Sequence, residues 1–406
     1  MRRLDVAVIG AGQAGLATSY WLSQRGIEHV VLERGQVAEV WRSRRWDSFA
    51  LNSPNWAFLL PGYAYDGADA DGFMLRDEIV DRFTAYARLF GAPVEPGVEV
   101  TALTRLDDGR YRLDSSSGQL VVRAVVVASG AYQRPNRPPA GPDQRLLQLS
   151  TDEFRNAAEL RDGGVLVVGS GQSGCQVAED LREAGRPVWL ATGSCGWIPR
   201  RYRGKDNVGW RMEMGTFDEP VDKIGHHLRL ACPPIQTGVA GGRDINLTTL
   251  RRSGVTLTGR FVAGDGNTVR LADDLAANAR RSDEAAIALR ARVDDFIRER
   301  GLAAPVEPAF EPAGDFGGAP TELDLAALNI TNLIWATGYR LDFGWIKLDL
   351  EQRDGYPSQT RGVSRHRGLY FMGLQLMHTR KSGLIFGVGE DAAHVALVIA
   401  EQLGAR

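Results

Sequence analysis

The sequence predicts an α/β fold of parallel strands and helices, built from two copies of one unit. Three observations predict it: an apolar run that enters a glycine-rich turn, a helical pattern behind that turn, and the return of the whole pattern later in the chain. In the first copy the apolar run at 5–9 precedes the turn at 10–15, and a second apolar run follows at 29–33. In the second copy the run at 165–169 precedes the turn at 169–174. We therefore expect two Rossmann-like domains.

The residue types of the first turn are those of a dinucleotide site. Gly10 allows a sharp turn, Gly12 has no side chain to keep a pyrophosphate from the backbone, and Gly15 allows close packing of helix on strand. The N-terminus of the following helix presents free N–H groups and the positive end of its dipole to the phosphates. Glu33 ends the next strand, where a carboxylate can accept a ribose hydroxyl. Dinucleotide binding is favoured over a plain structural turn.

The second copy differs from the first at the acidic position. Counted from the first glycine of each turn, Glu33 corresponds to Thr192, which carries no charge. A carboxylate there repels a 2′-phosphate, whereas a neutral residue near arginines accepts one. Arg200, Arg201 and Arg203 follow closely, although a solvated basic loop would have the same composition. The first unit therefore suits FAD or NAD, and the second suits NADPH better than NADH.

Composition describes an ordinary globular chain. Its 406 residues carry a net charge of −2, which argues against a general nucleic-acid binder, and 44 % of them are hydrophobic. The three cysteines are too few and too far apart for a disulfide framework, and no C-x-x-C is present. His226-His227 lack ligand spacing, so we expect no metal site. No signal peptide or membrane-length apolar run is seen, and we expect a cytoplasmic protein.

Local patterns predict the remaining elements. Residues 35–75 form an irregular segment rich in tryptophan, phenylalanine and tyrosine. Elsewhere we expect helices at 76–91, 270–300 and 383–402, strands at 98–103, 111–114, 120–122, 123–128, 188–191, 333–339 and 368–373, a strand pair near 255–262, a proline-rich crossing between domains at 135–142 and a linker at 305–320.

Taken together, these features resemble the class B flavoprotein monooxygenases, which include the flavin-containing monooxygenases, the plant YUCCA-type enzymes and bacterial relatives. The residues that carry the resemblance are the two glycine turns, Glu33, Trp41, Asn52-Ser-Pro-Asn55 and Ala336-Thr-Gly-Tyr339. The disulfide reductases share the paired turns, but they need a redox cysteine pair near the first turn, and this chain has none there. One departure is Ser150, at the histidine position of the family signature F-x-G-x-x-x-H-x-x-x-[FY]; the closing Phe154 is kept.

The resemblance implies a glutathione-reductase-like architecture, with an FAD domain at 1–155 and 325–406 and an inserted NADPH domain at 156–324. It also implies that NADPH reduces the flavin, that O₂ adds at flavin C4a, and that the resulting (hydro)peroxyflavin oxygenates a small organic substrate by N-, S- or Baeyer–Villiger oxidation. Two alternatives stay open: an NADPH-dependent oxidase or reductase without oxygen transfer, and a non-catalytic redox-sensing flavoprotein. The expected partners are the substrate and O₂, without nucleic acid or membrane; a homodimer is kept as an option.

The resemblance also assigns residues. Asn52 is the expected catalytic residue, with an amide near the flavin and NADP⁺, although an Asx turn before Pro54 would use the same residue. The aromatic segment 35–75 becomes a wall of the flavin site, and His378, Arg380 and Lys381 either line that site or form a polar helix entry. The expected cofactor-binding residues are Gly10, Gly12, Gln13, Ala14, Gly15, Glu33, Arg34, Val40, Trp41, Asn52, Ser53, Val100, Ser129, Gly130, Gly169, Ser170, Gly171, Gln172, Ser173, Gly174, Thr192, Arg200, Arg201, Thr337, Gly338 and Tyr339.

Overall fold

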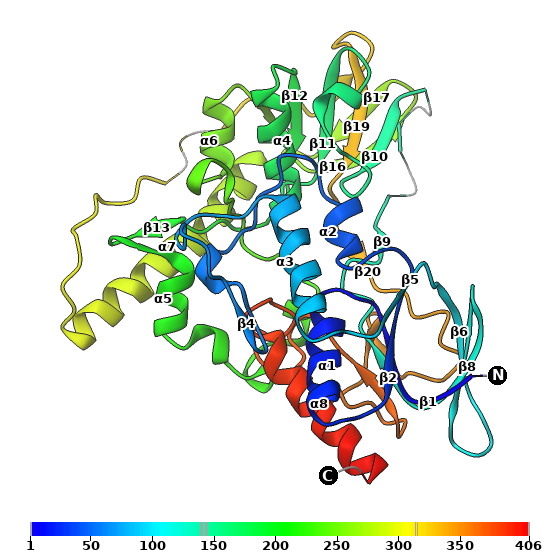
Figure 1. The fold of residues 1–406 in the computed structure, drawn as a ribbon. Helices are drawn as coiled ribbons and strands as arrows, with labels where there is room; N and C mark the ends of the chain where they lie inside the picture. The colour runs from blue at the N-terminus through cyan, green and yellow to red at the C-terminus, as the bar shows by residue number, and fades with distance from the viewer. Residues whose placement is uncertain (1, 139–140, 143–144, 313, 315, 405–406) are drawn as a thin grey trace.

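Two sheets, the first mixed and the second parallel, organise the chain in the computed structural model, which describes residues 2–138, 141–142, 145–312, 314 and 316–404 (Figure 1). The first sheet has the order β5-β2-β1-β8-β7-β6, and β23 also pairs with β8. Its strands are β1 (Arg2–Ile9), β2 (His29–Glu33), β5 (Val94–Pro96), β6 (Val100–Arg105), β7 (Tyr111–Ser115), β8 (Gly118–Val127) and β23 (Leu369–Phe371).

Helices from both ends of the chain cover the first sheet. They are α1 (Gln13–Gln24), α2 (Glu39–Ser43), α3 (Arg76–Leu89) and α8 (Val388–Leu403). α1 and α8 lie side by side, blue and red in Figure 1, and Trp21 Nε1 donates a hydrogen bond of 3.1 Å to the carbonyl oxygen of Gly389. The apolar face expected for 76–91 is confirmed, because Ile79, Phe83 and Tyr86 of α3 are fully buried.

The second sheet has the order β10-β19-β11-β12-β15, and all of its strands are parallel. They are β10 (Leu147–Ser150), β11 (Gly164–Val168), β12 (Val188–Ala191), β15 (Thr256–Thr258) and β19 (Ile330–Trp335), and the helices around them are α4 (Gln172–Glu183), α5 (Asn207–Glu213), α6 (Leu247–Arg252) and α7 (Leu275–Arg300). A small antiparallel sheet, β16 (Phe261–Asp265), β17 (Thr268–Leu271) and β18 (Glu322–Asp324), completes this unit.

The other elements are short. They are β3 (Leu59–Leu60), β4 (Tyr63–Ala64), β9 (Arg134–Pro135), β13 (Arg201–Tyr202), β14 (Lys205–Asp206), β20 (Tyr339–Arg340), β21 (Gln352–Arg353), β22 (Tyr356–Pro357) and the 3-10 helices η1 (Asn55–Ala57), η2 (Ala157–Glu159), η3 (Thr216–Asp218), η4 (Val221–Lys223), η5 (His226–Arg229) and η6 (Val239–Gly241). No helix in the described ranges is long and apolar enough to cross a membrane.

The α/β fold with two Rossmann-like units is confirmed, and two strands of the second sheet lie outside the limits expected for the second domain. β10 lies before residue 156 and β19 lies after residue 324, yet both pair within the second sheet. The second sheet therefore takes strands from both sides of the expected 156–324 insertion, and the domain limits stay a prediction. Periodicity could not show this, because an apolar strand carries no mark of the sheet it joins.

Three local expectations are wrong in detail. The expected strands 120–122 and 123–128 are one strand, β8, which pairs with β1 through residues 120–127, with β7 through residues 118–122 and with β23 through residues 125–127. The expected helix at 270–300 begins only at Leu275, because 268–271 is strand β17. The expected pair near 255–262 does not form, since β15 pairs with β12 and β16 pairs with β17. Of the expected crossing at 135–142 and linker at 305–320, residues 139–140, 313 and 315 lie outside the described residues.

The structure also joins two of the three cysteines, although they lie far apart in the sequence. Cys195 and Cys232 form a disulfide, 37 residues apart in sequence, and Cys175 is free and buried. The two cysteines meet because residue 235 runs beside residue 197 in an isolated parallel bridge. Spacing along the chain could not reveal that contact.

Candidate functional site

The first glycine turn has the close approaches that its residues predict. Gly10 has φ +106°, and a Cβ on it would lie 2.5 Å from the carbonyl oxygen of Ala128. A Cβ on Gly15 would overlap the carbonyl oxygen of Gly10, so α1 can sit on the turn only with glycine there. Gly12 is the N-cap of α1, and no side chain caps this helix. The backbone N–H groups of the first turn of α1 therefore remain donors for an anion.

Glu33 closes this turn from the end of β2. Its Oε2 accepts a hydrogen bond of 2.7 Å from the backbone N–H of Ala11, and its Oε1 accepts one of 3.0 Å from that of Gly35. Arg34 beside it is exposed. Val100, an expected cofactor-binding residue, lies on the edge strand β6 and pairs with Ser115 of β7. The backbone contact with Glu33 comes from Val98, whose N–H donates a hydrogen bond of 2.9 Å to the carbonyl oxygen of Glu33.

The second turn repeats this geometry. Gly169 has φ +106°, and its Cβ would lie 2.5 Å from the carbonyl oxygen of Ala336. A Cβ on Gly174 would overlap the carbonyl oxygen of Gly169. Gly171 is the N-cap of α4, again without a side-chain cap, and Gln172 and Ser173 form the first turn of that helix. The predicted repeat is therefore a structural repeat.

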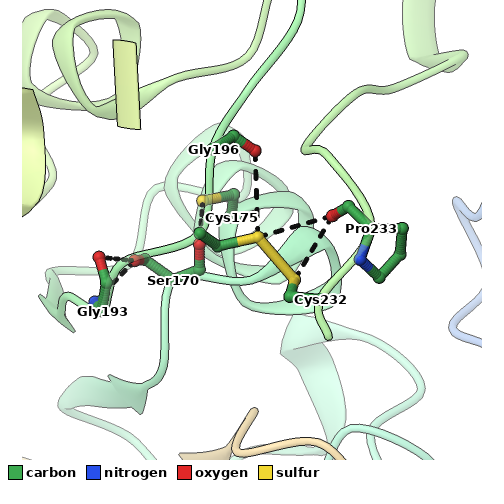
Figure 2. The surroundings of a disulfide bond; sticks show 7 residues. Ser170, Cys175, Gly193, Gly196, Cys232 and Pro233 are labelled. Carbon is green, nitrogen blue, oxygen red and sulfur yellow. Dashed lines mark hydrogen bonds between the residues drawn. A yellow bond between two sulfur atoms is a disulfide. The ribbon is translucent and has the colours of Figure 1, made fainter. Parts of the chain in front are cut away.

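Ser170 ties the second turn to the loop that follows β12. Its side chain is buried, and its Oγ accepts a hydrogen bond of 2.8 Å from the backbone N–H of Gly193 (Figure 2). Thr192 is also buried, and its hydroxyl donates to the carbonyl oxygen of Thr258 at 2.8 Å. At the Glu33-equivalent position the second unit therefore has an inward-facing hydroxyl.

Two Ser/Thr-Gly segments lie next to the turns in matching positions. Ser129-Gly130 follows β8 and Thr337-Gly338 follows β19, and the two glycines have φ of +83° and +82°. Ala128 precedes the first segment and Ala336 precedes the second. A Cβ on Gly10 would meet the carbonyl oxygen of Ala128, and a Cβ on Gly169 would meet that of Ala336. The likeness of these segments, seen in the sequence, is confirmed as spatial equivalence. They also lie at the crossing between units, where β9 pairs with β20.

Asn52 lies between the two units. Its Oδ1 accepts a hydrogen bond of 2.8 Å from Nε2 of Gln176 on α4, and its backbone carbonyl accepts one of 2.7 Å from Nη1 of Arg200. No described residue accepts from its Nδ2, which remains a free donor. Ser53 follows it, half-buried. Gln176 thus fixes the amide orientation, and sequence reasoning missed this partner because it belongs to the other unit.

Arg200, an expected phosphate ligand, is paired within the protein. Its side chain is 2 % exposed and pairs with Asp206 through two hydrogen bonds, Nε to Oδ2 at 2.8 Å and Nη2 to Oδ1 at 2.6 Å. Burial lowers the pKa of the Arg200 guanidinium, and the carboxylate of Asp206 opposes that shift. Arg200 therefore connects the segment after β12 to Asn52.

Arg201 and Arg203 are also held by the protein. Arg201 donates to the carbonyl oxygens of Gly242 and Gly241 at 2.9 and 3.0 Å, and Arg203 pairs with Asp294 at 3.1 Å. A different arginine, Arg281, is exposed on α7 and has no partner among the described residues. Sequence reasoning missed it because Arg281 lies more than one hundred residues after the second glycine turn.

The position of Arg281 follows from the residues around it. Asn278 Nδ2 lies 3.3 Å from the hydroxyl of Thr192, and the carbonyl oxygen of Ser282 accepts from the backbone N–H of Trp197 at 3.1 Å. Residues 278, 281, 282 and 285 lie along one stripe of a helix. This stripe faces the loop after β12, so Arg281 lies beside that loop.

Aromatic side chains of segment 35–75 form a packed wall on the first unit. Trp41 lies 5.9 Å from Phe49 and 6.3 Å from Phe83 between ring centroids, and Val40 beside it is half-buried. Arg45 lies over the rings of Trp41, Phe49 and Tyr132 at 5.5, 5.6 and 5.9 Å. Burial lowers the pKa of Arg45.

Tyr339 of the A-T-G-Y segment joins this wall across the crossing. Its ring lies 5.6 Å from Tyr132, and its hydroxyl is 2.9 Å from that of Thr151. Burial raises the pKa of Tyr339. Ser150, at the family's histidine position, is buried and accepts a hydrogen bond of 2.8 Å from Nε of Arg137.

The segment before α8 connects the two units a second time. Gln13 Nε2 donates to the carbonyl oxygen of Gly383 at 2.6 Å, and Val221 of the second unit donates to that of His378 at 2.8 Å. Arg380 pairs with Glu219, and Lys381 pairs with Asp218 and Glu390. These two cations therefore hold the units together.

Known proteins are similar to this chain in sequence and in fold. The family model for pyridine nucleotide-disulphide oxidoreductases matches residues 7–208. A CzcO-like oxidoreductase from Geobacillus kaustophilus is 30 % identical over 97 % of both chains, and the indole-3-pyruvate monooxygenase YUCCA1 of rice is 30 % identical over 96 % of this chain and 89 % of its own. A flavin-containing monooxygenase from Stenotrophomonas maltophilia matches the fold with a TM-score of 0.65, at 17 % identity over 99 % of both chains.

The YUCCA relative is similar across nearly the whole of this chain. The chain therefore belongs to the class B flavoprotein monooxygenases, a family of oxidoreductases that use FAD and NADPH.

Proposed function

We propose that this enzyme binds FAD at the first glycine turn and NADPH at the second, and that it oxygenates a small organic molecule where the units meet. The observation that carries the proposal is the placement of Asn52. Gln176 and Arg200 hold it from the second unit through its Oδ1 and its backbone carbonyl, while its Nδ2 remains a donor. An amide placed in this way can serve ligands of both units at once.

The first turn fits the pyrophosphate of FAD. A Cβ on Gly12 would meet no other described atom within 4 Å, so a phosphate can approach the backbone closely. α1 offers uncapped N–H groups beneath that space. Each oxygen of Glu33 accepts one backbone hydrogen bond and has a second lone pair, which can accept a ribose hydroxyl.

The second unit fits NADPH through its turn and Arg281. Gly171 and the uncapped start of α4 repeat the phosphate cradle. Arg281 is the cation that we assign to the 2′-phosphate, because it lies beside the loop that starts at Thr192 and has no partner in the described part of the chain. An arginine can bind a phosphate through two parallel hydrogen bonds.

Reduced FAD supplies the chemistry that activates O₂, and the protein supplies position and exclusion of water. The Trp41 wall shields one side of the proposed flavin site. The Nδ2 of Asn52 donates to an oxygen or amide acceptor that lies between the cofactors. The segment before α8 is bound to Gln13 through Gly383, and the N-terminus of α8 that follows would present the positive end of a helix dipole on the side of the first glycine turn. Nitrogen, sulfur and carbonyl substrates all remain candidates.

Isotope transfer tests the reaction. The FAD-loaded enzyme is supplied with NADPH, ¹⁸O₂ and in turn a tertiary amine, a thioether and a ketone. The proposal expects one ¹⁸O atom in product for each NADPH consumed with at least one of these classes. Complete conversion of NADPH electrons into H₂O₂ with every class would contradict oxygen transfer and favour an oxidase.

A pair of arginine variants tests the NADPH assignment. Arg281→Ala should raise the KM for NADPH about tenfold or more, the equivalent of one lost charge-assisted contact, and leave that for NADH unchanged. The matched control is Arg280→Ala, an exposed arginine one position earlier that points about 100° away around the helix. Equal KM changes in both variants would refute the assignment.

A further inference from the structure

The Cys195–Cys232 disulfide lies in the second unit, next to its glycine turn (Figure 2). Cys195 belongs to the loop after β12, and Cys232 belongs to the segment that follows η5. The Cα atoms are 6.1 Å apart, within the range that a disulfide spans. Neither the fold nor the proposed reaction uses this bond, so its position requires its own explanation.

The two glycine turns provide an internal comparison. Their first and third glycines have the same surroundings, as described above. Their middle glycines differ: a Cβ on Gly12 would meet no described atom within 4 Å, whereas a Cβ on Gly171 would lie 3.0 Å from Sγ of Cys232. The second turn therefore has a sulfur atom where the first turn is open.

That sulfur lies where a dinucleotide has to approach. The middle glycine of this turn exists so that a pyrophosphate can reach the backbone, and a sulfur in contact with it occupies the same space. The disulfide holds Cys232 there by joining it to Cys195. The loop after β12 is itself held to the turn through Gly193 and Ser170 (Figure 2).

The segment has an anchor just beyond Cys232. Ile235 is fully buried, its backbone N–H donates to the carbonyl oxygen of Gly196 at 2.8 Å, and its own carbonyl accepts from Ile198 at 3.3 Å. Cys232 and Pro233 are exposed. Cleavage of the disulfide would therefore free an exposed stretch that ends at a fixed point, without disturbing the sheet.

We propose that the Cys195–Cys232 disulfide is a reversible lock on the second dinucleotide site: the oxidised form hinders NADPH, and reduction by a low-molecular-weight thiol opens the site. This proposal rests on the assignment of NADPH to the second turn. Such a lock would make the binding of NADPH, and with it the reduction of the flavin, depend on the ratio of reduced to oxidised small thiols in solution.

The exchange balances as a two-electron reaction. The thiolate of one small thiol attacks Sγ of Cys232, the more exposed of the two; the S–S bond breaks, and Cys195 leaves as a thiolate that takes a proton from water. The thiolate of a second small thiol then attacks the sulfur of the first small thiol in the mixed disulfide. Cys232 leaves as a thiolate and takes a proton from water. Two small thiols are oxidised to one disulfide, and the protein gains two thiols.

The test measures NADPH affinity of the FAD-loaded enzyme in both redox states. The protein is reduced with dithiothreitol or oxidised with a small-molecule disulfide, desalted, and titrated with NADPH, while thiol labelling and mass spectrometry count the free cysteines. We expect NADPH binding about tenfold or more weaker in the oxidised form, which corresponds to an open state populated at a tenth or less. FAD content should not change.

Variants and controls separate the outcomes. Cys232→Ser and Cys195→Ser should each bind NADPH equally well under both treatments, whereas Cys175→Ser, altered at a buried cysteine outside the disulfide, should respond as the wild type does. Equal affinity in both states with the disulfide change confirmed would overturn the lock alone, and so would Cys195 and Cys232 that both remain free after oxidation. Absence of NADPH binding in every form would instead overturn the cofactor assignment, and the lock with it. The wild-type comparison decides even where a serine variant fails to fold.

Discussion

Arg200 offers a decisive perturbation, because sequence and structure assign it different roles. Its guanidinium donates two hydrogen bonds to Asp206 and one to the carbonyl oxygen of Asn52. Arg200→Met fills similar space but strands the carboxylate of Asp206, whose side chain is 12 % exposed. Removing one partner of a buried ion pair costs about 3–5 kcal/mol, and the residual exposure of Asp206 favours the lower end.

A loss of about 3 kcal/mol corresponds to a fall in Tm of about 6–12 °C for a unit of this size. Thermal unfolding followed by circular dichroism measures it, and the ratio of kcat/KM for NADPH and NADH is measured beside it. We expect the Tm to fall and the ratio to hold. The double variant Arg200→Met with Asp206→Leu should recover part of the loss, since no charge is stranded. An unchanged Tm with a lost NADPH preference would refute the reasoning and restore Arg200 as a phosphate ligand.

Four further outcomes are expected. Gly12→Ala should keep its Tm and lose most bound FAD, because the added Cβ meets no described protein atom within 4 Å and enters the space of the ligand. Gly15→Ala should fail to fold, because the added Cβ overlaps the backbone of Gly10. Flavin absorbance measures the bound FAD, and circular dichroism measures folding. Asn52→Ala should still be reduced by NADPH but release several-fold more H₂O₂ per NADPH, as a peroxide assay would show. Burial lowers the pKa of His29 in the folded protein below its ordinary value of 6.5. As the pH falls, His29 therefore takes up a proton first in the unfolded chain, and the stability of the folded protein falls. His29→Gln should flatten the decline in Tm between about pH 8 and pH 5.

Local chemistry made the first unit predictable. The Gly10–Gly15 turn, the helix behind it and strand β2 are all set by neighbours within thirty residues, and each formed where expected. The second turn was predictable for the same reason. The equivalence of Ser129-Gly130 and Thr337-Gly338 also followed from sequence, since both end an apolar strand with the same kind of pair.

Long-range contacts were not predictable in this way. Arg200 looked like a phosphate ligand because the sequence shows its charge and not Asp206 folded against it. Gln176 and Arg281 carry no local mark that directs one to Asn52 and the other to the loop after β12. The Cys195–Cys232 bond depends on a single bridge between distant segments. Each of these features arises from packing between elements, and no periodicity encodes such packing.

The central claim is that FAD on the first unit receives hydride from NADPH on the second. Its most direct test is anaerobic stopped-flow reduction of the dithiothreitol-treated, FAD-loaded enzyme, with NADPH and NADH compared at equal sub-saturating concentrations. The account predicts that the flavin absorbance bleaches about tenfold or more faster with NADPH. Equal rates with the two nucleotides would contradict the 2′-phosphate assignment, and no bleaching with either would contradict the pairing of the two sites.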